Sequence, residues 1–436
     1  MSQAVTPHAV APDAISDAAP DAPPDAAMRE CPDCGLFQRV PVMRPGLVAE
    51  CGRCGAVLRR RRRDALGTTL AFSVTGVVLL MIAAASPLLG FQLAGQATQT
   101  SLSSLPGSFQ EQGYGALAWV MIATTLLAPA LKLGLTIAVL AGLRTNMAPS
   151  TLAAMARWRQ TLTPWAMIEV FLLGVFVAYT RLASLAVVEV GVALYALGAL
   201  MLVMIAADAW LDEHALWESI GQARRSPAPV GNGPLIGCDH CGRVSRAAPG
   251  DPCPRCNATL QTRKPESIAR SWALLLAAAA LYIPANLYPV MTVIRFGKGA
   301  PSTILHGVEE LIQYRMWPLA LLVFAASIAV PVLKLASLSY LLISTQRHAT
   351  GRLRDRTRLY RIVDFIGRWS MIDVFMVAVL VALVRMGIIA SVTPGLGAVF
   401  FAGVVVLTML AAFSFDPRLM WDAAGQTGCD EAEAEA

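Results

Sequence analysis

The sequence predicts an all-α integral membrane protein made of two tandem repeats. Each repeat combines a small four-cysteine β ribbon with four transmembrane helices, giving eight helices in total. Hydrophobic residues make up 56% of the chain and charged residues only 15%, whereas soluble chains carry about 25% charged residues. The apolar residues gather in runs of about twenty or more, enough to cross a hydrocarbon core roughly 30 Å thick. Cysteine pairs and apolar runs recur in the same order in both halves.

The chain divides where its composition changes. We expect a disordered tail over 1–29, because these residues are mostly Ala, Pro and Asp and lack the apolar core of a signal peptide. The first ribbon, the first four helices, the second ribbon, the last four helices and a C-terminal tail are expected over 30–60, 66–212, 236–262, 268–416 and 417–436. The 47-residue segment 164–210 is almost continuously apolar and should form two helices with a tight turn near 181–189.

Eight of the nine cysteines form four Cys-x-x-Cys pairs, which fall into two sets. Each set supplies four thiolates at a spacing typical of a tetrahedral metal site, usually zinc, although sequence does not separate zinc from iron. Such a site has no open coordination position, so we expect it to stabilise a fold and not to catalyse. A Gly or Asn follows every pair and permits a turn with positive φ. The predicted ligands are Cys31, Cys34, Cys51 and Cys54, then Cys238, Cys241, Cys253 and Cys256.

Other interpretations of the cysteines are less consistent with the sequence. A thioredoxin-type redox pair would stand alone near a βαβ pattern, which is absent here. His240 lies within a pair, but four sulfurs already complete a tetrahedron, so we expect a solvated loop residue. Cys429 stands alone in the tail and receives no role.

Arginine clusters beside the apolar runs predict the orientation of the chain. Five consecutive arginines occupy Arg59–Arg63, and seven more lie in 347–368, between the sixth and seventh helices. The positive-inside rule places these clusters, both ribbons and both termini on the cytoplasmic side of the membrane. We expect a multi-pass protein of the bacterial inner membrane. Thiolate ligands also favour a reducing compartment. The net charge of +6 is explained by these clusters, so no nucleic-acid partner is expected.

Two of the four lysines lie inside apolar helices at equivalent places of the repeat, in Pro-x-Leu-Lys-Leu segments. In the next helix of each half, Lys132 is followed by Glu169 and Lys334 by Asp373. A charge at mid-membrane costs at least about 2.5–3.5 kcal/mol and normally finds a partner. The simplest arrangement is therefore a Lys–carboxylate pair in each half. A buried lysine can lose its proton, so such a pair could relay protons.

Hydroxyl groups accompany the lysines. Thr125 and Ser327 each lie seven residues before a lysine and therefore on the same helix face. Thr408 on the last helix can add another polar atom. A structural alternative is that Glu169 pairs with Arg159, and Asp373 with Arg368, and that these pairs only lock helices together.

Together, these features resemble a known family. The twin ribbons, the Pro-x-Leu-Lys-Leu segments, two Trp-x-Met-x-(Glu/Asp)-Val-Phe helix starts and two Asp-x4-Trp helix exits resemble the paraquat-inducible protein A family, in particular its lipophilic envelope-spanning tunnel protein A-like branch. The resemblance covers roughly residues 30 to 422. It implies an inner-membrane subunit that works with a periplasmic MCE-domain protein to move phospholipid between the inner and outer membranes. It also implies that transport uses Ser327, Lys334, Asp373 and Thr408.

Three functions are compatible with these features. The first is the lipid transporter that the resemblance implies. No G-x-x-x-x-G-K-[ST] motif is present, so its energy would come from an ion gradient, from another subunit or from no source. The second is a scaffold that anchors a partner. The third is a membrane thiol redox protein. No hydrolase constellation is visible, and we expect no enzyme activity.

Overall fold

The computed structural model describes residues 27–41, 43–93, 96–145, 147–183, 187–223, 233–295, 298–313, 315–384 and 390–426. Residues 1–26 of the expected disordered tail lie outside these ranges, and so does Cys429. The expectation is wrong for residues 27–29, which belong to a strand of the first ribbon.

Within the described ranges, eight helical spans are long and apolar enough to cross a membrane. The first half contributes α1 (Ala65–Ala85), α3 (Gly115–Met121) continued by α4 (Ala128–Arg144), α5 (Pro149–Leu162) continued by α6 (Ile168–Ala183), and α7 (Val192–Trp210). The second half contributes α9 (Ser267–Leu287), α11 (Trp317–Phe324) continued by α12 (Val330–Gln346), α13 (Leu353–Gly367) continued by α14 (Ile372–Leu383), and α15 (Leu396–Ser414). Shorter helices are α2 (Leu105–Glu111), α8 (Glu213–Ala223), α10 (Ile304–Gln313) and α16 (Arg418–Asp422).

The basic linkers expected before the third and seventh spans are helical. They form α5 and α13, and one 3-10 turn separates each from the membrane helix that follows. The second and sixth spans each contain a π-helical segment, at Ile122–Leu127 and Ala325–Ala329. The cause is Pro129 and Pro331, because a proline lacks an N–H and clashes with the carbonyl four residues earlier. Those carbonyls belong to Thr125 and Ser327.

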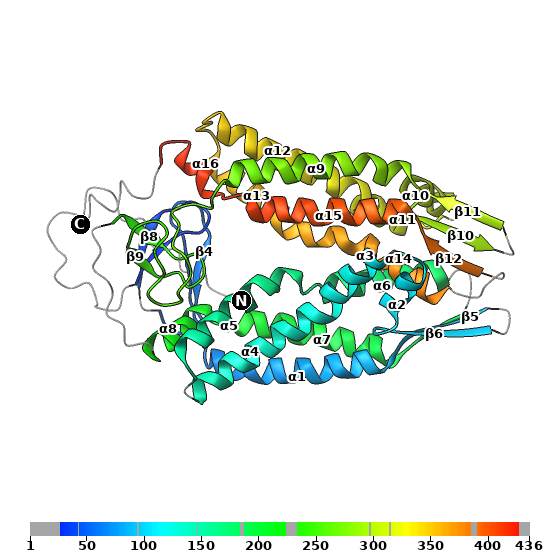
Figure 1. The fold of residues 1–436 in the computed structure, drawn as a ribbon, viewed down its shortest axis with the longest axis horizontal. Helices are drawn as coiled ribbons and strands as arrows, with labels where there is room; N and C mark the ends of the chain where they lie inside the picture. The colour runs from blue at the N-terminus through cyan, green and yellow to red at the C-terminus, as the bar shows by residue number, and fades with distance from the viewer. Residues whose placement is uncertain are drawn as a thin grey trace.

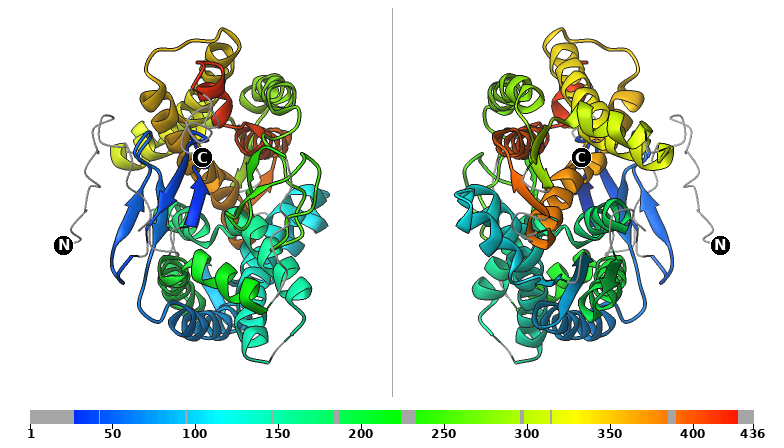
Figure 2. Two further views of the ribbon diagram at one scale, coloured as in Figure 1. Left: turned by 90° about the vertical axis from the view of Figure 1, so that its left-hand side faces the viewer. Right: turned by 90° about the vertical axis from the view of Figure 1, so that its right-hand side faces the viewer.

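The two halves form separate helical layers that meet through α6 and α14 (Figures 1 and 2). Within each layer the first helix packs along the last, α1 against α7 and α9 against α15. At the crossing of the layers, Phe171 and Phe375 stack edge to face with ring centroids 5.6 Å apart. Gly174 permits this approach, because a Cβ there would lie 2.8 Å from Phe375 Cβ.

A small antiparallel sheet caps each half at the end opposite the ribbons (Figure 1). The first sheet has the order β6-β5-β7, and the second has the order β11-β10-β12. The strands are β5 (Pro87–Leu93), β6 (Gln96–Ser101), β7 (Val187–Val190), β10 (Met291–Arg295), β11 (Lys298–Ser302) and β12 (Ala390–Pro394). The segment expected as a tight turn near 181–189 therefore contains part of a strand instead.

Each ribbon packs on the helices of the other half. Ribbon 1 consists of β1 (Ala27–Glu30), β2 (Phe37–Val40), β3 (Val48–Glu50) and β4 (Val57–Arg60). Its cysteines share an apolar cluster with Leu338, Leu353 and Trp421 of the second half. Ribbon 2, with β8 (Leu235–Gly237), β9 (Val244–Arg246) and a bridge between Pro252 and Thr259, packs its cysteines against Leu140, Leu152 and Trp217 of the first half. The ribbons are thus exchanged between the repeats.

Candidate functional site

Both sets of four cysteines converge as the sequence predicts. In ribbon 1 the Sγ atoms of Cys31 and Cys54, and those of Cys34 and Cys51, lie 3.5 Å apart. In ribbon 2 the distances are 3.4 Å for Cys238–Cys256 and 3.6 Å for Cys241–Cys253. A tetrahedron with metal–sulfur bonds of about 2.3 Å has edges of roughly 3.8 Å, whereas a disulfide bond measures about 2.05 Å. These buried clusters therefore fit a four-thiolate metal ion and not disulfide pairs.

The backbone at each cysteine pair is built to hold such an ion. The amide of the residue after each pair donates to the carbonyl of the first cysteine, for example Gly35 N to Cys31 O at 2.9 Å. This closes a turn that needs a positive φ, which is confirmed at Gly35 (73°), Gly55 (70°), Gly242 (65°) and Asn257 (60°).

Helix residues of the opposite half contact the cysteine turns directly. In α13, Arg361 donates to Asp33 (2.6 Å), to the Cys54 carbonyl (3.2 Å) and to Cys54 Sγ (3.4 Å). In α5, Gln160 donates to the His240 carbonyl (3.1 Å). His240, which was expected as a solvated loop residue, lies in a turn and is partly buried, and its ring is 3.4 Å from the Gln160 side-chain oxygen.

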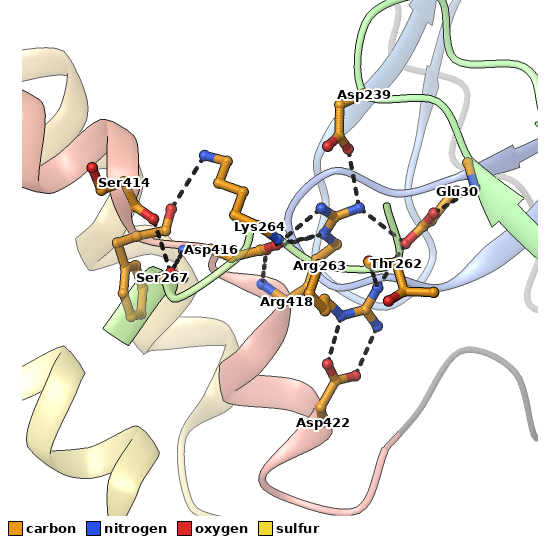
Figure 3. A network of polar contacts seen from close by, with 12 residues as sticks. Glu30, Asp239, Thr262, Arg263, Lys264, Ser267, Ser414, Asp416, Arg418 and Asp422 are labelled. Atoms are coloured by element: carbon orange, nitrogen blue, oxygen red, sulfur yellow. Dashed lines mark hydrogen bonds and ion pairs between the residues drawn. The ribbon is translucent and has the colours of Figure 1, made fainter. Parts of the chain in front are cut away.

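An ion-pair network joins both ribbons to the second half (Figure 3). At its centre Arg418 pairs with Asp416 (2.9 Å), Glu30 of ribbon 1 (3.2 Å) and Asp239 of ribbon 2 (3.1 Å). Arg263 links Glu30 (3.0 Å) to Asp422 (2.6 Å). Burial alone would raise the pKa of Asp416, but the hydrogen bonds and charge of Arg418 hold that pKa below its ordinary value.

This network explains the two Asp-x4-Trp exits. Asp416 accepts the backbone N–H of Arg418, and Asp212 accepts those of His214 and Ala215, so each aspartate satisfies free N–H groups at the start of the helix after the last span. The tryptophan that follows each aspartate, Trp217 or Trp421, then packs under the exchanged ribbon.

Inside the second half, Lys334 and Thr408 are brought together but Lys334 and Asp373 are not. Lys334 is 2% exposed, and its Nζ donates to Thr408 Oγ1 at 2.8 Å and to the Gly367 carbonyl at 3.4 Å. The expected hydrogen-bonded pair with Asp373 is therefore not formed, because Lys334 extends toward α15 and the end of α13.

Asp373 lies in the first turn of α14 and is 6% exposed. Among the described residues, neither of its carboxylate oxygens has a hydrogen bond of ordinary geometry. Ser327 lies close to it, but the Ser327 hydroxyl donates to the Val323 carbonyl at 2.7 Å. The carboxylate lines a small pocket together with Phe109, Val377 and other residues of both halves.

The first half is arranged differently. Lys132 pairs with Asp208 of α7 at 2.6 Å and not with Glu169, which corrects the expected pairing. Arg159 pairs with Glu213, so the structural alternative for Glu169 is also not formed. Sequence reasoning missed Asp208, although it lies four residues after Met204, the counterpart of Thr408, and hence on the same helix face. The Thr125 hydroxyl donates to the Met121 carbonyl at 2.7 Å, as Ser327 does to Val323.

Comparison with known proteins gives the same two repeats. A family model described as "Paraquat-inducible protein A" matches residues 66–221 and again 268–425. The chain belongs to the paraquat-inducible protein A family. It is 33% identical to "Intermembrane transport protein PqiA" of Escherichia coli (strain K12) over 397 residues, covering 90% of this chain and 95% of that protein. No solved structure matches it.

Two further relatives are similar to this chain over comparable lengths. "Lipophilic envelope-spanning tunnel protein A" of Escherichia coli (strain K12) is 31% identical over 396 residues, which cover 91% of each chain. A "Probable intermembrane transport protein" of Haemophilus influenzae is 26% identical over 400 residues, covering 90% of this chain and 95% of that protein. Each family-model match begins after a ribbon and spans the four helices and the capped exit helix of one half.

Proposed function

We propose that this protein is an inner-membrane subunit of an intermembrane lipid transport system, working with a periplasmic MCE-domain protein to move phospholipid between the inner and outer membranes. The names of its relatives, "Intermembrane transport protein PqiA" and "Lipophilic envelope-spanning tunnel protein A", support transport across the envelope. The ribbons, which we propose hold zinc, face the cytoplasm together with both termini. The arginine-rich segments at the ribbon end of the helices support this orientation.

The two small sheets then face the periplasm, where the partner would dock. They are suited to such a contact because the outer strands of each three-stranded sheet carry backbone groups that pair on one side only within the sheet. Thr98 of β6 also donates to the carbonyl of Leu383 at the end of α14, at 2.9 Å, which links the first sheet to the helix that carries Asp373.

The observation that carries the proposal is the difference between the two buried lysines. Lys132 is neutralised by Asp208, whereas Lys334 has a hydroxyl and a carbonyl as its hydrogen-bond partners. Burying a lysine without a carboxylate at hydrogen-bond distance is costly, and such a residue inside a membrane span, with Asp373 in the next membrane helix, normally marks a functional site. In this proposal the second half couples lipid transport to its energy source through Ser327, Lys334, Asp373 and Thr408.

Lipid transfer between vesicles tests the proposal, with the periplasmic partner present and equal amounts of folded protein. We expect Lys334→Ala and Asp373→Asn each to reduce transfer at least tenfold. The matched control Lys132→Ala should retain most transfer, because its lost partner Asp208 lies within the last turn of α7, which ends at Trp210, and can reach the membrane surface from there. If both second-half variants transfer lipid at the wild-type rate, these groups only hold helices together and the scaffold function gains support.

A further inference from the structure

A cavity of about 660 Å³ lies between the two ribbons and the ends of the helices beneath them. Its lining includes β1 and β4 of ribbon 1, the first cysteine turn of ribbon 2, the start of α8 and the start of α16. Because the ribbons are exchanged, equivalent parts of the two repeats lie around the same cavity. The charges on the two repeats, however, are arranged in opposite ways.

The side that belongs to the second half is neutralised. Arg418, which is 3% exposed, has carboxylates of Asp416, Glu30 and Asp239 within 3.2 Å. The equivalent position in the first half is His214, whose Nε2 lies 2.8 Å from the Leu58 carbonyl. The second-half side of the cavity, around Arg418, is therefore closed by ion pairs within the protein.

The side that belongs to the first half carries a buried cation without such partners. Arg29 of β1 is 5% exposed and lines the cavity. Its guanidinium lies against Gly242, since a Cβ at that glycine would come 2.6 Å from Arg29 Nη1 and 3.6 Å from His214 Cε1. Among the described residues, Arg29 Nε and Nη1 have no hydrogen-bond partner.

The charges near Arg29 are of both signs. Arg59 and Arg255 are near enough to repel it, and the opposing side chains are Glu218 and the Cys241 thiolate. Glu218 is already engaged by Arg59 at 3.4 Å. Arg29 also forms no hydrogen bond with a cysteine sulfur, whereas Arg361 does so at 3.4 Å from Cys54 Sγ. The Cys241 thiolate can offset part of the Arg29 charge, but among the described residues it leaves Arg29 Nε and Nη1 without an acceptor.

We propose that Arg29 and Arg59 form an anion site in this cavity that binds a phosphate group. A buried, unsatisfied charged donor is costly, and an anion would remove that cost. The planar fork of an arginine matches two oxygens of a phosphate. The cavity has ample room for a phosphate group, carried either by a small solute or by the headgroup of a phosphomonoester lipid at the adjacent membrane surface.

Phosphate titration of the purified, metal-loaded full chain in phosphate-free detergent tests this site. Calorimetry at constant ionic strength should show saturable binding of inorganic phosphate and none of chloride. Arg29→Gln should weaken the affinity at least tenfold, and Arg59→Gln should weaken it by a smaller factor. Arg246→Gln is the matched control, because Arg246 is an exposed arginine of ribbon 2 outside the cavity lining. Metal content is measured in every variant.

A second arm distinguishes the two sources of phosphate. Nanodiscs containing phosphatidic acid, but not those containing phosphatidylcholine alone, compete with inorganic phosphate if the site takes a lipid headgroup. If nanodiscs of neither composition compete with inorganic phosphate, the site takes a soluble phosphate. The proposal is overturned if neither phosphate nor phosphatidic acid binds saturably, or if metal-replete Arg29→Gln binds as the wild type does. If Arg29→Gln loses metal, an unchanged affinity in metal-replete Arg59→Gln overturns it.

Discussion

Arg418 connects both ribbons to the second helical half, so we expect its removal to destabilise the protein strongly. In Arg418→Met, the side chains of Asp416 and Glu30, which are 1% and 5% exposed, lose a charged partner. Removing one partner of a buried ion pair costs about 3–5 kcal/mol. The lower end applies here, because Glu30 keeps Arg263 and the Gly237 amide, and Asp416 keeps the Lys264 amide. We therefore expect a loss of about 3 kcal/mol, roughly 150-fold in the unfolding equilibrium.

Reversible unfolding in mixed micelles of rising dodecyl sulfate content, followed by circular dichroism, measures this change. The matched control is Arg270→Met, whose ion pair with Glu266 is exposed and should contribute at most about 1 kcal/mol. Asp416→Asn combined with Arg418→Met should cost about 1–3 kcal/mol less than the sum of the single variants. Because the folded pKa of Asp416 is lowered, its contribution is complete above about pH 4 and is lost on further acidification. Additive single variants, or a loss below 1 kcal/mol for Arg418→Met, would refute the reasoning.

Two further predictions concern the helix crossing and the metal centres. Gly174→Val should cost about 1–3 kcal/mol in the same unfolding assay, because its Cβ would lie 2.8 Å from Phe375 Cβ and 3.1 Å from a backbone oxygen. The control Gly198→Ala places its Cβ in open space and should stabilise the protein by up to about 1 kcal/mol. Equal effects of the two variants would contradict this explanation. Mass spectrometry of the purified protein should find two zinc ions per chain, and Cys253→Ser should lower this to one by emptying ribbon 2 alone. A variant that keeps both ions would show that Cys253 is not a required ligand, and one that loses both would show that the two clusters are not independent.

The sequence predicts the features that short segments determine. Apolar run length locates all eight spans, because hydrocarbon thickness sets the length of a spanning helix. Cysteine spacing identifies both clusters, and the residue after each pair predicts its positive φ. These signals are contained within about thirty residues each, so they do not depend on how distant segments pack.

Features that depend on distant contacts were missed or predicted incorrectly. Strand β5 pairs with β7 about a hundred residues later, and no local pattern indicates that partner. The partner of Lys132 was expected in the next helix, at Glu169. A 3-10 turn at Thr163–Trp165 precedes α6, and sequence does not give the rotation of α6 after that turn. The exchange of ribbons has the same cause, since each ribbon could in principle meet either of two similar repeats.

The exchanged ribbons also have a consequence for how such a chain could have arisen. Ribbon 1 covers the second half and ribbon 2 covers the first, so the contact is reciprocal, as in a twofold-symmetric dimer whose subunits swap an element. A single repeat released from the chain would leave its cysteine turns and its Trp217 or Trp421 uncovered. An ancestral one-repeat protein with this architecture would have existed as an obligate homodimer. The two copies now differ at the buried lysine, which meets Asp208 in the first half and Thr408 in the second.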